Sequence, residues 1–302
     1  MSSIYVEIRM QDKMDELWRL TQTPEIHARW DLRFTEIEYL PRPNENLPQR
    51  FLYRTRIGFG LAIAGEGEAV GSRNDASGCR TSALKFWSDD PRSLIREGSG
   101  YWQYVPTEDG IRFLTRYDYR TRFGFLGKWA DRLLFRPLMG WATAWSFDRL
   151  RLWLERGVDP TLSLLRTSLH ALARLTLALL WIYQGLVPKL LFRDTGELTI
   201  LQHAHLFPGF EGTALRCVGA GEILLGLALL LFWRTRALLS FNIVLMIALA
   251  IGVLFSQPAL FIAPFNPATL NLSMIALALV GLWCDRDLPT ARNCRRKPEE
   301  KS

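Results

Sequence analysis

The sequence predicts an α+β domain at residues 1–156, followed by an all-α bundle of four transmembrane helices. Charged residues are spread over Met1–Arg166 and become rare after it. No Asp, Glu, Lys or Arg occurs in Ala237–Cys284, a run of 48 residues in a chain that is 22% charged. As a helix, Ala237–Phe255 alone would rise roughly 28 Å, which matches the hydrocarbon core of a bilayer. We therefore expect a membrane protein with a polar N-terminal half.

Apolar stretches long enough to cross a bilayer recur through residues 167–285, which we expect to form the membrane domain. Gly157, Asp159 and Pro160 interrupt a helical pattern, so residues 157–166 are expected to be a linker. The spanning helices are predicted near residues 168–187, 215–233, 237–255 and 268–284, and residues 286–302 are expected to form a basic cytoplasmic tail.

Basic residues predict the orientation in the membrane. Arg166 precedes the first predicted span, Arg234 and Arg236 separate the second from the third, and the basic tail follows the fourth. The segment Ser256–Pro267 has no Lys or Arg. The positive-inside rule then places both termini in the cytoplasm and the bundle in the inner membrane. Anionic lipid headgroups account for the net charge of +7, and no basic pattern typical of nucleic-acid binding is present.

The N-terminal half alternates apolar and polar residues from Ile4 to Met10, which predicts a half-buried strand. Two short helical patterns follow it, and the half closes with a long helical pattern at Leu126–Arg156. An antiparallel sheet wrapped around one helix is an α+β architecture with room for a cavity on its concave face. Between the helices we expect strands at Phe34–Leu40, Arg50–Ile57, Ala62–Val70, Cys79–Trp87, Ile95–Val105 and Ile111–Thr121.

Residues 1–156 resemble the START-like ligand-binding superfamily (SRPBCC), whose helix-grip fold also occurs in polyketide cyclases. The resemblance rests on the element order and on three short motifs, Asp15-Glu16-Leu17-Trp18, Pro24-Glu25-Ile26 and Arg29-Trp30. It implies that the domain binds an apolar small molecule or lipid beside the bilayer. On the long helix, Trp129, Leu133 and Trp145 are the candidate cavity residues, with core packing against the sheet as the alternative for both tryptophans.

Residues 167–284 resemble the DoxX-like membrane family, which has four spans. The matching residues are Trp181-Ile182-Tyr183-Gln184-Gly185-Leu186-Val187-Pro188-Lys189 and Gly219-Ala220-Gly221-Glu222-Ile223. Some relatives are linked to membrane redox assemblies, including thiosulfate-to-quinone electron transfer. A subunit of a quinone-linked redox complex, with a membrane redox partner, is therefore a second hypothesis. A non-catalytic membrane anchor or interaction module is a third.

Glu222 is the only charged residue between Arg216 and Arg234, and a carboxylate inside a membrane must be paired, protonated or hydrated. It shares a helix face with two glycines, which would let a neighbouring helix approach closely. Gln184 and Lys189 of the first predicted span are its expected partners. The site is either a structural pair that holds the helices together or a ligand or proton site.

No cofactor or metal site is identified from the sequence. His203 and His205 stand two apart, but a His-x-His pair without a third ligand is more typical of a surface loop. The cysteines are scattered without a Cys-x-x-Cys pair. His27 and Cys79 are the only His and Cys of the N-terminal half, so no nucleophilic triad is recognisable there.

The orientation can be tested with reporter fusions. Alkaline phosphatase fused after Ser302 should be inactive, because this enzyme needs an oxidising compartment outside the cytoplasm to form its disulfides. The same enzyme inserted within Ser256–Pro267 should be active. The reverse pattern of activity would overturn the predicted topology.

Overall fold

The computed structural model describes residues 3–11, 13–44, 47–58, 60–192, 196–203, 205, 207–262, 264 and 266–299. The chain divides into two compact units. The sheet unit comprises Met1–Ser163 together with Pro289–Ser302, and the helical unit comprises Leu164–Leu288.

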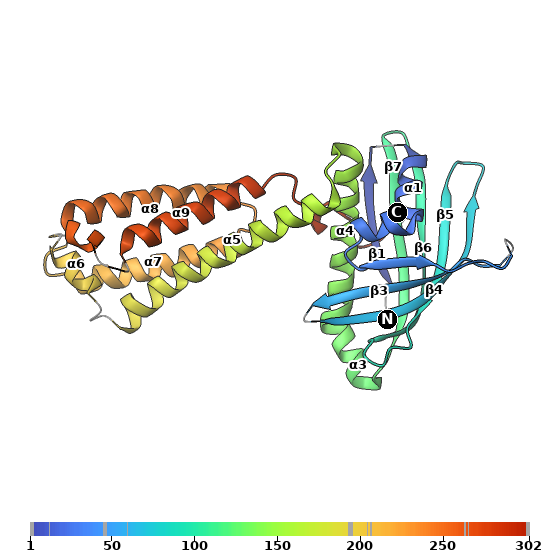
Figure 1. The fold of residues 1–302 in the computed structure, drawn as a ribbon, viewed down its shortest axis with the longest axis horizontal. Helices are drawn as coiled ribbons and strands as arrows, with labels where there is room; N and C mark the ends of the chain where they lie inside the picture. The colour runs from blue at the N-terminus through green and yellow to red at the C-terminus, as the bar shows by residue number, and fades with distance from the viewer. Residues whose placement is uncertain are drawn as a thin grey trace. The chain divides into compact units, whose positions relative to one another are not determined.

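The sheet unit contains a seven-stranded antiparallel sheet with the strand order β1-β7-β6-β5-β4-β3-β2 (Figure 1). Alternation of apolar and polar residues predicts each strand because successive side chains point to opposite faces. The strands are β1 (Ile4–Met10), β2 (Glu36–Tyr39), β3 (Arg50–Gly58), β4 (Leu61–Asn74), β5 (Arg80–Trp87), β6 (Ile95–Thr107) and β7 (Gly110–Thr121).

Two short helices, α1 (Met14–Gln22) and α2 (Pro24–Trp30), follow β1. The strands are followed by one long helical run, made of α3 (Gly124–Ala130), the π-helical turn η1 (Asp131–Phe135) and α4 (Arg136–Arg156). The π turn ends two residues before Pro137, which has no N–H to donate to the carbonyl one turn earlier. The predicted α+β helix-grip architecture is confirmed by this element order and sheet.

The inner face of the sheet is closed over β1, β7 and β6. The ring of Phe113 on β7 stacks on that of Phe147 on α4, with centroids 4.4 Å apart. Beside them, Oη of Tyr117 is 2.9 Å from Oγ1 of Thr143 on α4. Burying an aromatic side chain stabilises the fold by roughly 1.5–3 kcal/mol, so this aromatic core is a main source of stability.

Inward-facing glycines let the sheet curve. A Cβ on any of four glycines would collide with an aromatic side chain on the neighbouring strand. Aromatic rings that cover glycines in this way stabilise positions where a strand bends. The pairs, each directly opposite in the strand register, are Gly65 with Tyr53, Gly67 with Phe51, Gly98 with Phe86 and Gly100 with Tyr117.

The predicted linker at residues 157–166 is wrong for most of its length, because α5 (Pro160–Leu186) begins within it. Only Gly157–Asp159 are non-helical. Gly157 has a φ of 65° and ends α4 in the left-handed conformation. Asp159 accepts a hydrogen bond from the backbone N of Thr161 at 2.7 Å, so it caps α5, with Pro160 at the first helical position.

Part of the predicted basic cytoplasmic tail at residues 286–302 packs against the sheet unit. Backbone N and O of Arg295 both pair with Glu7 of β1, at 2.9 Å each, and so satisfy the open edge of the sheet at this position. The buried carboxylate of Asp148 on α4 accepts from the backbone N of Thr290 at 2.8 Å and from Nδ2 of Asn293 at 2.9 Å. A buried carboxylate needs such donors, and the C-terminal segment adds two to the one that Arg151 supplies within α4, at 2.8 Å from its Nε.

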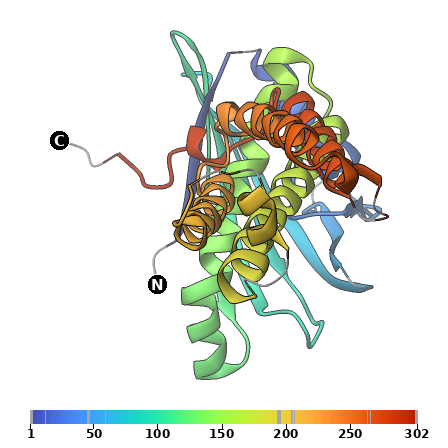
Figure 2. The ribbon, with the colours of Figure 1, turned by 90° about the vertical axis from the view of Figure 1, so that its left-hand side faces the viewer.

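In the helical unit, four helices among the described residues are long and apolar enough to cross a membrane, as the sequence predicted. Figure 1 labels them, and α8 and α9 lie side by side there and in Figure 2. Its elements are α5, the π turn η2 (Val187–Leu191), α6 (Glu197–His203), α7 (Glu211–Leu231), α8 (Arg236–Ser256), the 3-10 turn η3 (Pro258–Ile262) and α9 (Pro267–Cys284).

Arg174 of α5 is fully buried in the helical unit. Its guanidinium donates to the carbonyl oxygens of Leu229 and Phe232 at 3.1 Å and of Thr235 at 2.7 Å. The carbonyls of Leu229 and Phe232 lie at the C-terminal end of α7, where the last carbonyls have no partner within the helix and carry partial negative charge, and that of Thr235 lies just before α8. Arg174 therefore stabilises the turn between α7 and α8.

The contact of the C-terminal segment with α4 predicts a local loss of stability in Asn293→Ala. This variant removes a hydrogen bond to the buried carboxylate of Asp148, which is worth about 1.5–3 kcal/mol. Hydrogen exchange of the Arg295 amide should then accelerate by about tenfold or more in the full-length protein. Arg292→Ala, at an exposed residue of the same segment, is the matched control. Equal exchange in the two variants would show that Asp148 does not hold the segment.

Candidate functional site

A buried polar cluster lies where α2 joins the strands. Arg33 donates to Oδ1 of Asp31 from Nε at 2.9 Å and to Oδ2 from Nη2 at 2.6 Å, and Nε2 of His27 is 2.9 Å from the same Oδ2. Burial by itself would raise the pKa of Asp31, but the Arg33 guanidinium and the His27 hydrogen bond hold that pKa below its usual value. Burial lowers the pKa of His27, so its ring is neutral near pH 7.

His27 also joins the closed core to the rest of the inner face. Its ring stacks on Trp30 at a centroid distance of 4.9 Å and meets the edge of Trp102 at 4.9 Å. On its other side lies Phe34 at 5.2 Å, and Phe34 in turn meets Tyr53 of β3 at 5.7 Å. An aromatic row therefore runs from the core under α4 to β3.

The two ends of this row differ in exposure. Trp30 and Trp102 are buried, whereas Tyr53 and the other inward residues of β3 and β5, including Phe51, Leu84 and Phe86, are half-buried. The inner face thus has an apolar aromatic surface over β3–β5 that solvent reaches, beside the polar cluster. Binding sites for small molecules commonly combine an apolar concave surface with a few polar groups.

Two of the three predicted cavity residues on the long helix do not face the sheet. Trp129 and Leu133 are 60% and 59% exposed. Trp145 is buried, but it packs near Trp141 and under the guanidinium of Arg149 and is not a member of the sheet-side core. The helix carries apolar residues on several faces, so its sequence could not tell which face meets the sheet.

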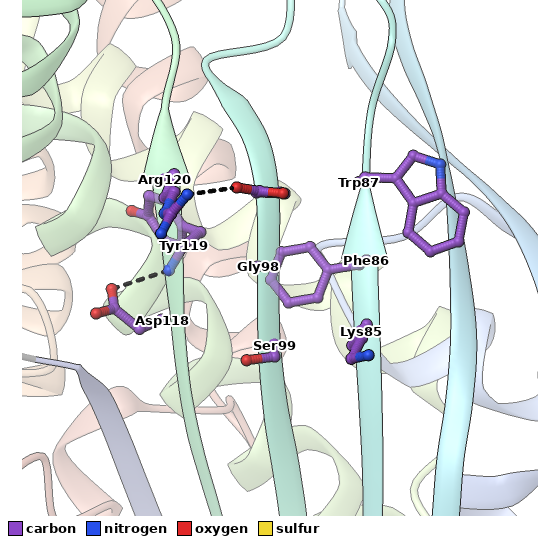
Figure 3. A pocket seen from close by; sticks show the side chains of 9 residues that line it. Lys85, Phe86, Trp87, Gly98, Ser99, Asp118, Tyr119 and Arg120 are labelled. Atoms are coloured by element: carbon purple, nitrogen blue, oxygen red, sulfur yellow. Dashed lines mark hydrogen bonds and ion pairs between the residues drawn. The ribbon is translucent and has the colours of Figure 1, made fainter.

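A hollow of about 430 Å³ lies on the sheet (Figure 3). It is lined mostly by polar residues of the outer face, and an ion pair of 3.0 Å joins Arg120 to Glu97 beside it. It does not match the apolar cavity predicted between the sheet and the long helix. Its lining residues are Lys85, Phe86, Trp87, Glu97, Gly98, Ser99, Asp118, Tyr119 and Arg120.

The polar cluster was not predicted as a site. His27, Asp31 and Arg33 fall within one short segment, and a single His there was assigned no role. The available signal was the spacing of a His and an Asp four residues apart at the end of a helix, followed by an Arg. That signal is common in capping turns, so only the packing of Trp102 and Tyr117 against the cluster identifies it.

In the helical unit, Nζ of Lys189 is 3.0 Å from Oε2 of Glu222 and 2.8 Å from Oε2 of Glu197. Gln184 takes part through its backbone carbonyl, which is 3.3 Å from Nζ of Lys189. The prediction that the Gln184 side chain is the more secure partner of Glu222 is not supported by any contact in the described residues. Within the described residues, Oε2 of Glu222 accepts no hydrogen bond of good geometry. Its contact with Nζ of Lys189 is therefore an ion pair.

The ion pair lies where α5 and α7 approach closely. A Cβ on Gly185 would lie 2.3 Å from the carbonyl oxygen of Gly219, and a Cβ on Gly226 would lie 2.8 Å from that of Ala178. Small residues permit such close approach between helices in a membrane. Glu222 lies between Gly219 and Gly226 of α7, so its side chain is held at the helix–helix contact.

His203 and His205 are both exposed, and Nδ1 of His203 is 2.8 Å from the carbonyl oxygen of Thr199. In the part of the chain that the structure describes, no three His, Cys, Asp or Glu side chains gather as a metal site would require.

These features define a membrane protein with four candidate spans and an antiparallel sheet unit. Residues 178–279 match the model of the DoxX-like family. The uncharacterized membrane protein YndG of Bacillus subtilis (strain 168) is 53% identical over 184 residues, which cover 60% of this chain and 68% of YndG. The chain therefore belongs to the same family of membrane proteins as YndG, and its spans include a DoxX-like region.

Solved structures similar to the N-terminal region include a STAR-related lipid transfer protein from Xanthomonas axonopodis. It is 15% identical, with 50% of this chain and 84% of that chain covered and a TM-score of 0.37. The Zhui aromatase/cyclase from Streptomyces sp. R1128 is 13% identical, with 49% and 95% covered and a TM-score of 0.34. We base the architecture of the sheet unit on its own strand order and packing.

The Lys189–Glu222 pair predicts an asymmetry between two variants. Glu222→Gln should be tolerated, because Lys189 keeps Glu197 as a partner. Lys189→Met should destabilise the protein by about 3–5 kcal/mol, because it leaves the buried carboxylate of Glu222 without a cation. Thermal unfolding of the purified protein in mild detergent measures both.

Lys189→Met combined with Glu222→Gln should recover most of the stability lost in Lys189→Met alone. An equal loss of thermal stability in Lys189→Met and Glu222→Gln would argue against a structural ion pair. If Glu222 instead serves a proton or a quinone, Glu222→Gln should abolish activity while leaving unfolding unchanged.

Proposed function

We propose that the sheet unit binds an apolar small molecule or lipid on the half-buried inner face of β3–β5. The observation that carries the proposal is the contrast along one aromatic row, buried at Trp102 and solvent-accessible at Tyr53. An apolar ligand covering the accessible end would gain roughly 25 cal/mol for each Å² of apolar surface removed from water.

The polar cluster supports a ligand with one hydrogen-bonding end. Asp31 is ionised and paired with Arg33, and His27 is neutral, so the cluster has no net charge. A site of this kind favours an uncharged polar group, such as a hydroxyl or carbonyl, over a carboxylate or phosphate. The ligand class is therefore a largely apolar molecule with a neutral polar end.

The membrane context suits such a ligand, because apolar molecules concentrate in the bilayer. The N-terminal strand β1 and the C-terminal segment at Arg295 pair in one unit, which supports an even number of spans between them. We place both termini in the cytoplasm and the spans in the inner membrane, from the basic residues that flank the spans.

Matched variants on β5 test the proposal. Leu84 is on the inner face, opposite Gly100, and its neighbour Lys85 points to the outer face, within reach of Glu68. Leu84→Trp should fill the inner face and reduce ligand occupancy by about tenfold or more, because each 1.4 kcal/mol of lost affinity is a factor of ten. Lys85→Trp should not change the occupancy.

Native mass spectrometry of the full-length protein in mild detergent measures the bound molecule. Co-purification of an apolar molecule with the wild type and with Lys85→Trp, and its loss from Leu84→Trp, is the expected result. Equal occupancy in all three proteins would place the molecule on the membrane helices and contradict the proposal.

A further inference from the structure

The helical run α3–η1–α4 exposes a row of large apolar side chains, which we call the apolar stripe. Their side chains are between 42% and 80% exposed. Soluble surfaces rarely carry a contiguous apolar patch of this kind unless it meets a partner or a membrane. The residues of the apolar stripe are Phe125, Leu126, Trp129, Leu133, Leu134, Leu138 and Trp141.

Within the helical run that carries the apolar stripe, the exposed charges have one sign, and outside it Asp118 of β7 pairs with Arg136 at 2.9 Å. Every exposed residue between Phe125 and Trp141 is apolar or basic, and the basic ones are Lys128 and Arg132. The one acidic residue in this range is Asp131, which is fully buried and accepts from Nε of Arg136 at 2.8 Å. The exposed surface of the run is therefore purely cationic and apolar.

The C-terminal segment adds another cation at the same place. Nη2 of the exposed Arg296 donates to the backbone carbonyl of Pro137 at 3.0 Å. A Cβ on Gly140 would lie 2.7 Å from that same nitrogen, so the guanidinium lies directly against the helix. Its charge is held beside the apolar stripe by a backbone contact.

We propose that the apolar stripe docks the sheet unit onto an anionic bilayer surface. Trp and Leu inserted at the headgroup boundary, flanked by Lys and Arg, are the composition of helices that lie in the membrane interface. The charges within the run make it too polar to span a bilayer. Charge complementarity selects anionic lipids, since each basic residue near such a surface adds to binding.

The chain itself keeps a bilayer within reach. Only Gly157–Asp159 separate α4 from α5, whose candidate span begins at Pro160. A docking surface on the preceding helix therefore needs only weak affinity, because the attached spans give it a high local concentration of lipid. This inference does not depend on a ligand on the inner face.

Spin labels on the full-length protein test the docking. In a Cys217→Ser, Cys284→Ser background, the native cysteines that are left, Cys79 and Cys294, are buried. One label is placed at Leu133→Cys in the apolar stripe, and a control label at Lys85→Cys on the exposed sheet surface. The protein is reconstituted into phosphatidylcholine vesicles with or without phosphatidylglycerol, and power saturation measures access to oxygen and to a water-soluble nickel chelate.

In vesicles with phosphatidylglycerol, the Leu133 label should be accessible to oxygen and shielded from nickel, and the Lys85 label should show the reverse. In vesicles of phosphatidylcholine alone, the Leu133 label should be less shielded from nickel. Adding Lys128→Glu and Arg132→Glu should reduce the ratio of docked to undocked protein by at least about fivefold for each residue changed.

Nickel access at Leu133 equal to that at Lys85 would overturn the proposal. Shielding of Leu133 from both reagents would also overturn it, because it would mean that a protein covers the apolar stripe. If the Leu133 label is open to nickel while a ligand is still bound on the inner face, the docking proposal fails and the proposed function stands.

Discussion

The architecture of the sheet unit depends on the curvature of its sheet, and that curvature depends on glycines that face aromatic residues. Where Gly98 lies opposite Phe86, a side chain on the glycine would collide with the ring. The curved sheet is then too wide for one helix to cover. Residues of α4 such as Phe147 fill the β1 end of the inner face, and the β3–β5 end keeps half-buried rings. The same geometry turns another side of the long helix outward as the apolar stripe.

Several buried charges in both units are paired locally. Asp31 meets Arg33 and Asp131 meets Arg136, each at 2.8 Å or less, and neither carboxylate is left without a cation. In the helical unit, Lys189 meets two acids, and Arg174 instead meets backbone carbonyls at a helix end. These pairs contribute specificity more than stability, because desolvating both ions offsets much of their attraction.

The C-terminal segment packs against the sheet unit, although almost the full length of the chain separates it from β1. Arg295 pairs with Glu7 at the sheet edge, and Asp148 receives donors from the same segment. The segment protects β1, which would otherwise present unpaired backbone groups. The sheet unit is therefore complete only after the last candidate span has been made, which couples its assembly to that of the membrane helices.

Local patterns in the sequence determined the elements of this protein. The charge-free run Ala237–Cys284 and its neighbours specify the candidate spans, because hydrocarbon tolerates few charges. Period-two alternation specified the strands, and the breakers Gly157 and Pro160 marked a helix boundary, although they cap two adjoining helices and do not begin a long linker. The close approach of the helices beside Glu222 also followed from the spacing of its flanking glycines.

Only the tertiary structure decided which faces and which distant segments meet. Trp129 and Trp145 belong to one helical run, on α3 and α4, yet one is exposed and the other buried, because the π turn and the curved sheet set the face that packs. The cluster of His27, Asp31 and Arg33 becomes a candidate site only when strands from elsewhere in the chain bring aromatic rings against it. The return of Arg295 to β1 had no local signal, since a backbone pairing across nearly 290 residues leaves no periodic trace in the sequence.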